Sequence, residues 1–325
     1  MRRLDFGSRP QVLTGSLDGY LTAGSLGRMK PLPLPAELRA APFTVSEAAS
    51  VGIGEKRLRG SDLFSPHHGV RSMRAPSGIR ERCLAYLPLL RPGQAFSHVS
   101  AASLWGLPVP RAISPGVLHV VFTGARGPRR PGVVGHFDSA PNLMFFGEIP
   151  VSSPLDVWAQ CSTLLELDDL VAMGDALAGR WSGQPEARER PLAELEASVI
   201  RWGRRRGARR LREALELVRA RVWSPRETAL RLLIVRAGLP EPPELNADVR
   251  ADDDTWLGCS DMVYRARRLA VEYQGDQHRT DKRQWRNDVR RRERYVDAGW
   301  RMLEVTDDDL IAPNDFLVRL AGLLR

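Results

Sequence analysis

The last third of the chain is organised around one stretch, Val271-Glu272-Tyr273-Gln274-Gly275-Asp276-Gln277-His278-Arg279. Residues 269–273 form a short, mostly apolar run that ends before Gly275, and this pattern predicts a largely buried strand. Side chains two positions apart on a strand share a face, so Glu272 and Gln274 are expected to project together. The stretch therefore predicts an acidic side chain near the end of a core strand.

A second acidic side chain, Asp261, is expected beside Glu272. Residues 256–264 predict the preceding strand, and a tight basic turn at residues 265–268 connects it to the next one. Two carboxylates that converge on one point repel each other unless a cation lies between them. Hard oxygen ligands suit Mg²⁺, which is commonly held by one or two carboxylates and a substrate phosphate. Asp261 and Glu272 are therefore candidate ligands of Mg²⁺ (or Mn²⁺), and such an ion activates water for phosphodiester chemistry.

The order of motifs over the last hundred residues resembles the PD-(D/E)XK nuclease superfamily, and more closely its very-short-patch-repair-like branch. The motifs begin at Ser224-Pro225-Arg226-Glu227 and end at the Gly299-Trp300 strand. The resemblance implies a restriction-endonuclease-like αββαβ domain in residues 223–325, closed by a strand at 301–305 and a helix at 314–324. It also implies a role for each matching residue: Asp261 and Glu272 as metal ligands, Glu227 as an auxiliary acid, Gln274 in the place of the signature lysine, His278 as an acid or base near the leaving group, and Asp288 and Arg291 as supporting residues.

Several of these residues also fit structural roles. Glu227 lies three residues after Ser224, with Pro225 at the first helical position, so its carboxylate equally fits a capping box with the Ser224 amide. A lone histidine such as His278 commonly makes structural hydrogen bonds. Gln274 carries no charge, so it cannot act as a base or stabilise an anion as lysine does. Superfamily members with glutamine at this position exist, so the resemblance leaves activity open.

The length of the chain, 325 residues, predicts two or three domains with enough apolar content to build cores. The sequence has no run of about eighteen apolar residues and no apolar signal core after Met1, so we expect no membrane span and a cytoplasmic location. The three cysteines, Cys83, Cys161 and Cys259, are widely spaced, which argues against a disulfide framework or a zinc cluster.

The net charge of +9 indicates an anionic partner, and we expect DNA. The excess is uneven. Residues 223–325 hold 18 basic and 19 acidic residues, whereas residues 1–222 hold 30 and 20. The candidate catalytic domain is therefore not the basic part, and affinity for nucleic acid is expected from the front of the chain.

Residues 1–35 are rich in Gly, Ser, Leu and Pro and predict a flexible extension, and residues 36–80 predict a winged helix-turn-helix unit. A capping-box pattern at Thr44 and Glu47 opens a short helix, a basic helix follows from Glu55, and residues 63–73 have the extended pattern of a β-wing. This region resembles the N-terminal winged-helix domain of abortive-infection-type antitoxins (AbiEi). A small helical cap with solvated arginines is the alternative. The candidate DNA contacts are Lys56, Arg57 and Arg59.

The middle region, residues 81–180, resembles the part that follows the winged helix in those antitoxins. It predicts strands at 118–122 and 133–137, a helix that starts at Ser153-Pro154 and an apolar-periodic stretch at 164–177. We interpret the histidines of this region, His98, His119 and His136, as structural.

Two basic helices are predicted near the candidate nuclease domain. Residues 181–222 form a basic helical linker, with nine arginines between positions 201 and 221. Its basic face is either solvated or follows DNA phosphates. Residues 282–294 form the second helix, with basic and apolar residues on opposite stripes. The candidate DNA contacts of this region are Arg279, Arg283, Arg286, Arg290 and Arg291.

The sequence thus predicts a multidomain α/β protein with two alternative functions. The first is a Mg²⁺-dependent DNA endonuclease, in which a metal-bound water attacks phosphorus. The second is a non-catalytic DNA-binding regulator of AbiEi antitoxin type, whose degenerate nuclease fold serves dimerisation or scaffolding, with a second copy and a cognate toxin as further partners. An enzyme of the same fold that acts on RNA also stays open, because metal chemistry does not distinguish the sugar.

Overall fold

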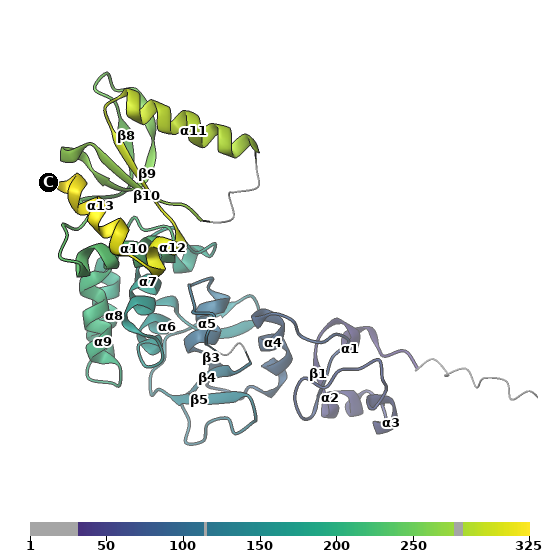
Figure 1. Cartoon of the computed structure of the whole chain (residues 1–325). Coiled ribbons are helices and arrows are strands. Elements are labelled where there is room, and N and C mark those ends of the chain that lie inside the picture. The colour runs from purple at the N-terminus through teal and green to yellow at the C-terminus, as the bar shows by residue number, and fades with distance from the viewer. Residues whose placement is uncertain (1–31, 114–115, 276–281) are drawn as a thin grey trace, which may run out of the picture.

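The computed structural model describes residues 32–113, 116–275 and 282–325, with side chains described from Val289 onward in the last range. A small N-terminal unit, a middle unit around a five-stranded sheet and a C-terminal unit around a four-stranded sheet follow one another along the chain (Figure 1). The predicted mixed α/β class is therefore confirmed. No helix in the described ranges is long and apolar enough to cross a membrane.

The N-terminal unit is built around a short two-stranded sheet. Its elements are α1 (Ala36–Ala40), β1 (Phe43–Thr44), α2 (Val45–Ser50), α3 (Glu55–Leu58) and β2 (Val70–Arg71). The predicted capping box is present at the start of α2, because Thr44 Oγ1 accepts from the Glu47 N–H at 3.0 Å and a Glu47 carboxylate oxygen accepts from the Thr44 N–H at 2.6 Å. A small core holds the elements together: Leu34, Leu38, Phe43, Ala48 and Leu58.

The middle unit has a sheet of order β5-β4-β3-β7-β6, in which β4 and β5 run parallel. The two strands predicted at 118–122 and 133–137 are confirmed as β4 and β5, and the Ser153 hydroxyl caps the predicted helix start by accepting from the Asp156 N–H. The elements are α4 (Ile79–Tyr86), β3 (Gln94–Phe96), α5 (His98–Leu104), β4 (Leu118–Phe122), β5 (Val133–Phe137), β6 (Leu143–Phe146), β7 (Ile149–Ser152), α6 (Pro154–Cys161) and α7 (Leu167–Ala178).

The segment predicted as a basic linker is built into this middle unit. It forms α8 (Leu192–Trp202) and α9 (Ala208–Leu217), whose apolar residues Leu195, Val199 and Leu211 lie in the same core as α5, α6 and α7. The arginines lie on the outside, and two of them pair with buried acids of the middle unit: Arg201 with Asp156 and Arg205 with Asp138.

The C-terminal unit is a four-stranded sheet of order β11-β10-β9-β8 with helices on both faces (Figure 1). Strands β8, β9 and β10 form an antiparallel meander, and β11 returns parallel to β10 after α11. Leu230 of α10 and Phe316 of α13 pack on one face, whereas Tyr295 of α11 packs on the other. The elements are α10 (Pro225–Arg236), β8 (Glu244–Arg250), β9 (Trp256–Tyr264), β10 (Leu269–Tyr273), α11 (Lys282–Asp297), β11 (Arg301–Val305), α12 (Asp307–Ile311) and α13 (Asn314–Leu324).

One strand of this unit, β8, is absent from the predicted αββαβ order, which is corrected to αβββαβ. The strand reads Glu-Leu-Asn-Ala-Asp-Val-Arg, a strict alternation of polar and apolar residues that is typical of a half-buried strand. Because Asn and Asp are disfavoured in strands, residue propensities alone do not predict a strand here.

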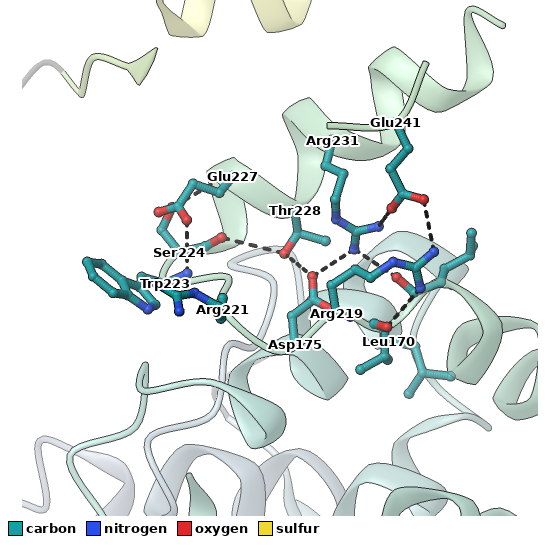
Figure 2. A network of polar contacts seen from close by, with 12 residues as sticks. Leu170, Asp175, Arg219, Arg221, Trp223, Ser224, Glu227, Thr228, Arg231 and Glu241 are labelled. Atoms are coloured by element: carbon teal, nitrogen blue, oxygen red, sulfur yellow. Dashed lines mark hydrogen bonds and ion pairs between the residues drawn. The ribbon is translucent and has the colours of Figure 1, made fainter. Parts of the chain in front are cut away.

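Helix α10 belongs to two cores at once. Leu230 and Ile234 lie in the core of the C-terminal sheet, whereas Leu232 lies in the core of the middle unit. Between them, Arg231 is fully buried and pairs with Asp175 of α7 (Figure 2). The middle and C-terminal units are therefore joined through a shared helix.

Candidate metal centre

The candidate carboxylates lie where two strands of the C-terminal sheet part. The β9–β10 ladder runs from Leu269–Tyr264 to Val271–Met262 and ends there. Beyond that point β10 continues beside β11, and β9 continues beside β8. Asp261 and Glu272 are the next residues on the two parting strands, so they lie at the fork. Instead of continuing the backbone ladder, Asp261 accepts a hydrogen bond from the Tyr273 N–H through Oδ2 at 2.8 Å.

The environment of Asp261 disfavours its ionised form. Burial raises the pKa of Asp261 to about 7, and the negative charges of Glu227 and Glu272 act in the same direction. The Tyr273 N–H and the Arg291 guanidinium oppose this rise of the pKa. Burial also raises the pKa of Glu272, against the attraction of Arg291. Glu227 and Glu272 thus both lie close enough to Asp261 to raise its pKa.

Glu227 is held in the first turn of α10 by contacts with two other segments. Its N–H donates to Ser224 Oγ at 3.1 Å, which is one half of the predicted capping box. The carboxylate accepts from the Trp223 N–H at 2.9 Å and from Asn246 Nδ2 at 2.6 Å. The second half of the box is therefore displaced by one residue, from the predicted Ser224 amide to Trp223, and Glu227 also contacts β8.

Asn246, which belongs to none of the predicted motifs, fixes Glu227. Its backbone has a positive φ of 43°, a conformation that asparagine adopts more readily than most residues. Its Nδ2 also donates to the Arg221 carbonyl at 2.7 Å, and Arg221 Nη2 donates back to the Asn246 carbonyl at 2.6 Å. The only sequence signal for this role is an asparagine inside an alternating strand pattern.

Glu272 is neutralised from α11. Both of its carboxylate oxygens accept from Arg291, one of them from Nη1 at 2.7 Å. The same guanidinium lies 5.5 Å from the centroid of the Tyr295 ring and donates to the Cys259 carbonyl. Gly258 leaves room for it, because a Cβ there would lie 2.6 Å from Arg291 Nε. Arg291 was predicted as a supporting residue and as a DNA contact, and the structure places it on Glu272.

The structure describes only some of the other residues that were predicted for the site of the C-terminal unit. Gln274 is half-buried, and its N–H donates to the Val305 carbonyl at 2.7 Å. Arg290 is exposed on α11. His278 and Arg279 lie outside the described residues, and so do the side chains of Arg283, Arg286 and Asp288.

The predicted DNA contacts of the N-terminal unit divide into two kinds. Lys56 is exposed, and Arg59 is exposed as well and pairs with Glu55 at 2.8 Å. Arg57 instead turns inward: it makes two hydrogen bonds with Asp62, at 3.0 and 2.7 Å, and a third with the Leu32 carbonyl at 2.5 Å. Arg57 is therefore occupied inside its own unit.

Comparisons with protein-family models, with curated proteins and with solved structures found no match to this chain. The resemblances to nucleases and antitoxins accordingly rest on the sequence motifs alone.

Proposed function

We propose that the chain is a Mg²⁺-dependent endonuclease that hydrolyses phosphodiester bonds of DNA. The observation that carries this proposal is the position of Asp261 and Glu272 at the fork between β9 and β10, with Glu227 close enough to raise the pKa of Asp261. Buried carboxylates that repel one another are costly to a fold unless a cation binds there. The arrangement therefore favours a site for a hard divalent ion.

The carboxylate oxygens of Asp261 and Glu272 suit such an ion. Asp261 and Glu272 would hold it, and Mn²⁺ would suit the same oxygen ligands. A carboxylate has about four lone-pair sites, so Glu272 keeps acceptor capacity after pairing with Arg291. When bound, the divalent ion supplies an activated water and neutralises charge on the phosphate.

The residues around the ligands have separate tasks in this proposal. The Tyr273 N–H and Arg291 orient the two metal ligands through the hydrogen bonds that they donate. Glu227, fixed by Trp223 and Asn246, adds negative charge beside Asp261 and favours the bound cation. Gln274 would hydrogen-bond to substrate where the family signature has a lysine, with no charge to contribute.

The test is cleavage of supercoiled plasmid in Mg²⁺ or Mn²⁺ by the wild type and by the variants Asp261→Asn and Glu272→Gln. Asp315→Asn serves as the control, because Asp315 is an exposed carboxylate in the first turn of α13. We expect nicking by the wild type and the control, and none by the two site variants. Cleavage by Asp261→Asn at the wild-type rate would refute the proposal.

The stability of Asp261→Asn gives a second readout on the same protein. The asparagine keeps an oxygen that can accept from the Tyr273 N–H, and it removes a carboxylate whose ionised form is disfavoured. We therefore expect this variant to be as stable as the wild type in chelator, or more stable, while inactive. A loss of both stability and activity would instead indicate a structural role for Asp261.

A second candidate function is a non-catalytic DNA-binding regulator of AbiEi antitoxin type. The pairing of Glu272 with Arg291 favours this function, since an arginine that neutralises the carboxylate can replace a metal ion. The uncharged Gln274, in the place of the signature lysine, favours it as well. The second copy and the cognate toxin proposed as partners belong to this alternative. It predicts DNA retardation at low salt without cleavage.

The regulator is tested with Lys56→Ala/Arg59→Ala, because both side chains are exposed. We expect this double variant to lose DNA binding under the regulator proposal. Arg57 is unsuitable for the purpose, since its replacement would remove three internal hydrogen bonds. Unchanged affinity of the double variant would contradict the proposed role of the N-terminal unit.

A further inference from the structure

Three histidines of the middle unit meet on one side of its five-stranded sheet. His119 lies on β4 and His136 on β5, and the parallel register pairs His136 with Val121, two residues beyond His119. Because residues two apart share a face, both rings project to the same side. His98 is the first residue of α5, with Ser97 between it and the end of β3, and its ring stacks on that of His136 with centroids 3.6 Å apart.

The ring nitrogens are spaced for a single ion. His119 Nδ1 and His136 Nε2 lie 2.9 Å apart, and one ligand nitrogen from each of the three rings lies within 4.8 Å of the others. Two imidazoles on one tetrahedral zinc, each about 2.0–2.1 Å from the metal, would have nitrogens roughly 3.3 Å apart. The first pair lies at hydrogen-bond distance, slightly closer than this spacing, and the three rings are stacked, so they must turn for their nitrogens to converge on one ion.

The burial of the histidines favours the neutral form that metal binding needs. It lowers the pKa of all three rings, that of His136 to about 4. His98 Nδ1 lies 3.0 Å from Ser97 Oγ. This is the kind of outer contact that commonly fixes the tautomer of a metal-binding histidine and leaves the other nitrogen free to bind.

The backbone of His98 is held in an unusual conformation. Its φ is +49°, in the left-handed region, which is uncommon for residues other than glycine although histidine adopts it more readily than most. Its N–H donates to Gln160 Oε1 at 3.1 Å, and Gln160 Nε2 donates to Ser152 Oγ at 3.1 Å. Backbone strain of this kind persists where the surrounding structure enforces it, and it gathers at functional sites.

A cavity of ≈ 610 Å³ lies beside the cluster. Its lining includes His98, His136, Asp138, Thr163 and Arg205. A metal ion held by the three rings would therefore face a space that admits water or a small ligand. Three protein ligands and one open position are the arrangement of catalytic zinc sites, whereas structural zinc sites have four protein ligands.

We propose that His98, His119 and His136 bind one first-row transition-metal ion, with Zn²⁺ favoured, in a three-imidazole site whose fourth position opens into this cavity. Imidazole ligands suit Zn²⁺ and its neighbours, whereas Mg²⁺ prefers oxygen. The site is therefore distinct in chemistry and in position from the carboxylates of the C-terminal unit. The alternative is a hydrogen-bonded histidine cluster that binds no metal.

The experiment uses the full chain, stripped with chelator and titrated with Zn²⁺ by calorimetry and with Co²⁺ by visible absorption. We expect one equivalent of metal and the absorption bands of Co²⁺ in a tetrahedral nitrogen site. His136→Gln is the main variant, because His136 is half-buried on strand β5 and its replacement disturbs the core least. It should weaken binding by at least about 100-fold, since it removes one of only three protein ligands.

Three further variants make the result decisive. Ser97→Ala should weaken binding by about 10–100-fold, as the loss of an outer contact does. His68→Gln, at an exposed histidine, and Asp261→Asn/Glu272→Gln should bind as the wild type does. The proposal is overturned if the metal affinity of the wild type is no higher than that of His136→Gln. It is also overturned if His68→Gln or the carboxylate variant loses the ion. If His136→Gln does not fold, Ser97→Ala with unchanged affinity overturns it equally.

Discussion

Replacement of Arg231 by methionine should destabilise the protein strongly, because Arg231 is the buried ionic link between α7 and α10. Its Nη2 lies 3.0 Å from Asp175 Oδ2 (Figure 2). The same nitrogen donates to the Leu217 carbonyl at 2.8 Å. Its Nη1 lies 3.2 Å from Glu241. The side chains of Arg231 and Asp175 are 0% and 1% exposed, so neither charge can turn to water when its partner is removed.

The magnitude follows from the charge that is left behind. Removing one partner of a buried ion pair costs about 3–5 kcal/mol, and we expect Arg231→Met in this range because Asp175 would stay buried. Asp175→Leu should cost less, about 1–3 kcal/mol, because Arg231 keeps Glu241 as a partner while the Arg219 N–H and the Thr228 hydroxyl lose an acceptor. In Asp175→Leu/Arg231→Met neither charge of the pair is left unpaired, and the main loss is again the acceptor of the Arg219 N–H and the Thr228 hydroxyl, about 1–3 kcal/mol. The double-mutant cycle should therefore give a coupling energy of at least about 3 kcal/mol.

The assay is urea unfolding followed by tryptophan fluorescence, with Arg236→Met as the matched control. Arg236 lies on the same helix, five residues on, and pairs with Asp168 of the same α7, but their side chains are 50% and 46% exposed. An exposed pair contributes at most about 1 kcal/mol. If Arg231→Met costs no more than Arg236→Met, or if the double variant is the least stable of the set, the reasoning is wrong.

Three further predictions concern single side chains. Thr44→Ala removes the hydroxyl that accepts from the Glu47 N–H, whereas the backbone N–H at position 44 can still donate to Glu47. The variant should destabilise α2 by about 1 kcal/mol, seen as faster hydrogen exchange in the N-terminal unit and unchanged exchange elsewhere. The hydrogen bonds from Arg57 hold the pKa of Asp62 below its usual value. The ionised form of Asp62 therefore stabilises this unit above about pH 4, and this stabilisation is lost as the pH falls through the lowered pKa. Asp62→Asn should therefore flatten the acid dependence of the unit's exchange, and an unchanged profile would contradict this. Gln274→Lys restores the charge of the nuclease signature and should raise the rate of plasmid nicking; an equal or lower rate in a folded variant would count against the assigned position.

Local patterns in the sequence predicted the elements that carry the carboxylates. Residues 269–273 form an apolar run whose two ends are marked by a basic turn and a glycine, and the strand β10 has these bounds. The hairpin placed Asp261 beside Glu272, because register follows from the short connection. The fork between β9 and β10 could not be predicted in this way, because it depends on the other strands of the sheet. Beyond the last β9–β10 pair, β9 pairs with β8 and β10 pairs with β11.

Contacts between residues that lie far apart in the sequence could not be predicted from local patterns. His98, His119 and His136 have no common spacing, and they meet only because β3, β4 and β5 pair side by side. Each taken alone fits a structural histidine, as predicted, and only their convergence suggests a ligand set. Arg231 lies among apolar residues of α10, where a charged residue is expected at the surface, and its partner Asp175 lies in another unit.

The position of Glu227 depends on both halves of the molecule. This residue and Arg231 lie one turn apart on α10, and Thr228, between them, donates to Asp175 at 2.8 Å. Leu232 fixes the helix to the middle unit, whereas Leu230 fixes it to the sheet that carries Asp261. The spacing between Glu227 and Asp261 is therefore set by two cores together. Since Glu227 raises the pKa of Asp261 only while their spacing is kept, the middle unit contributes to the electrostatics of the candidate metal centre.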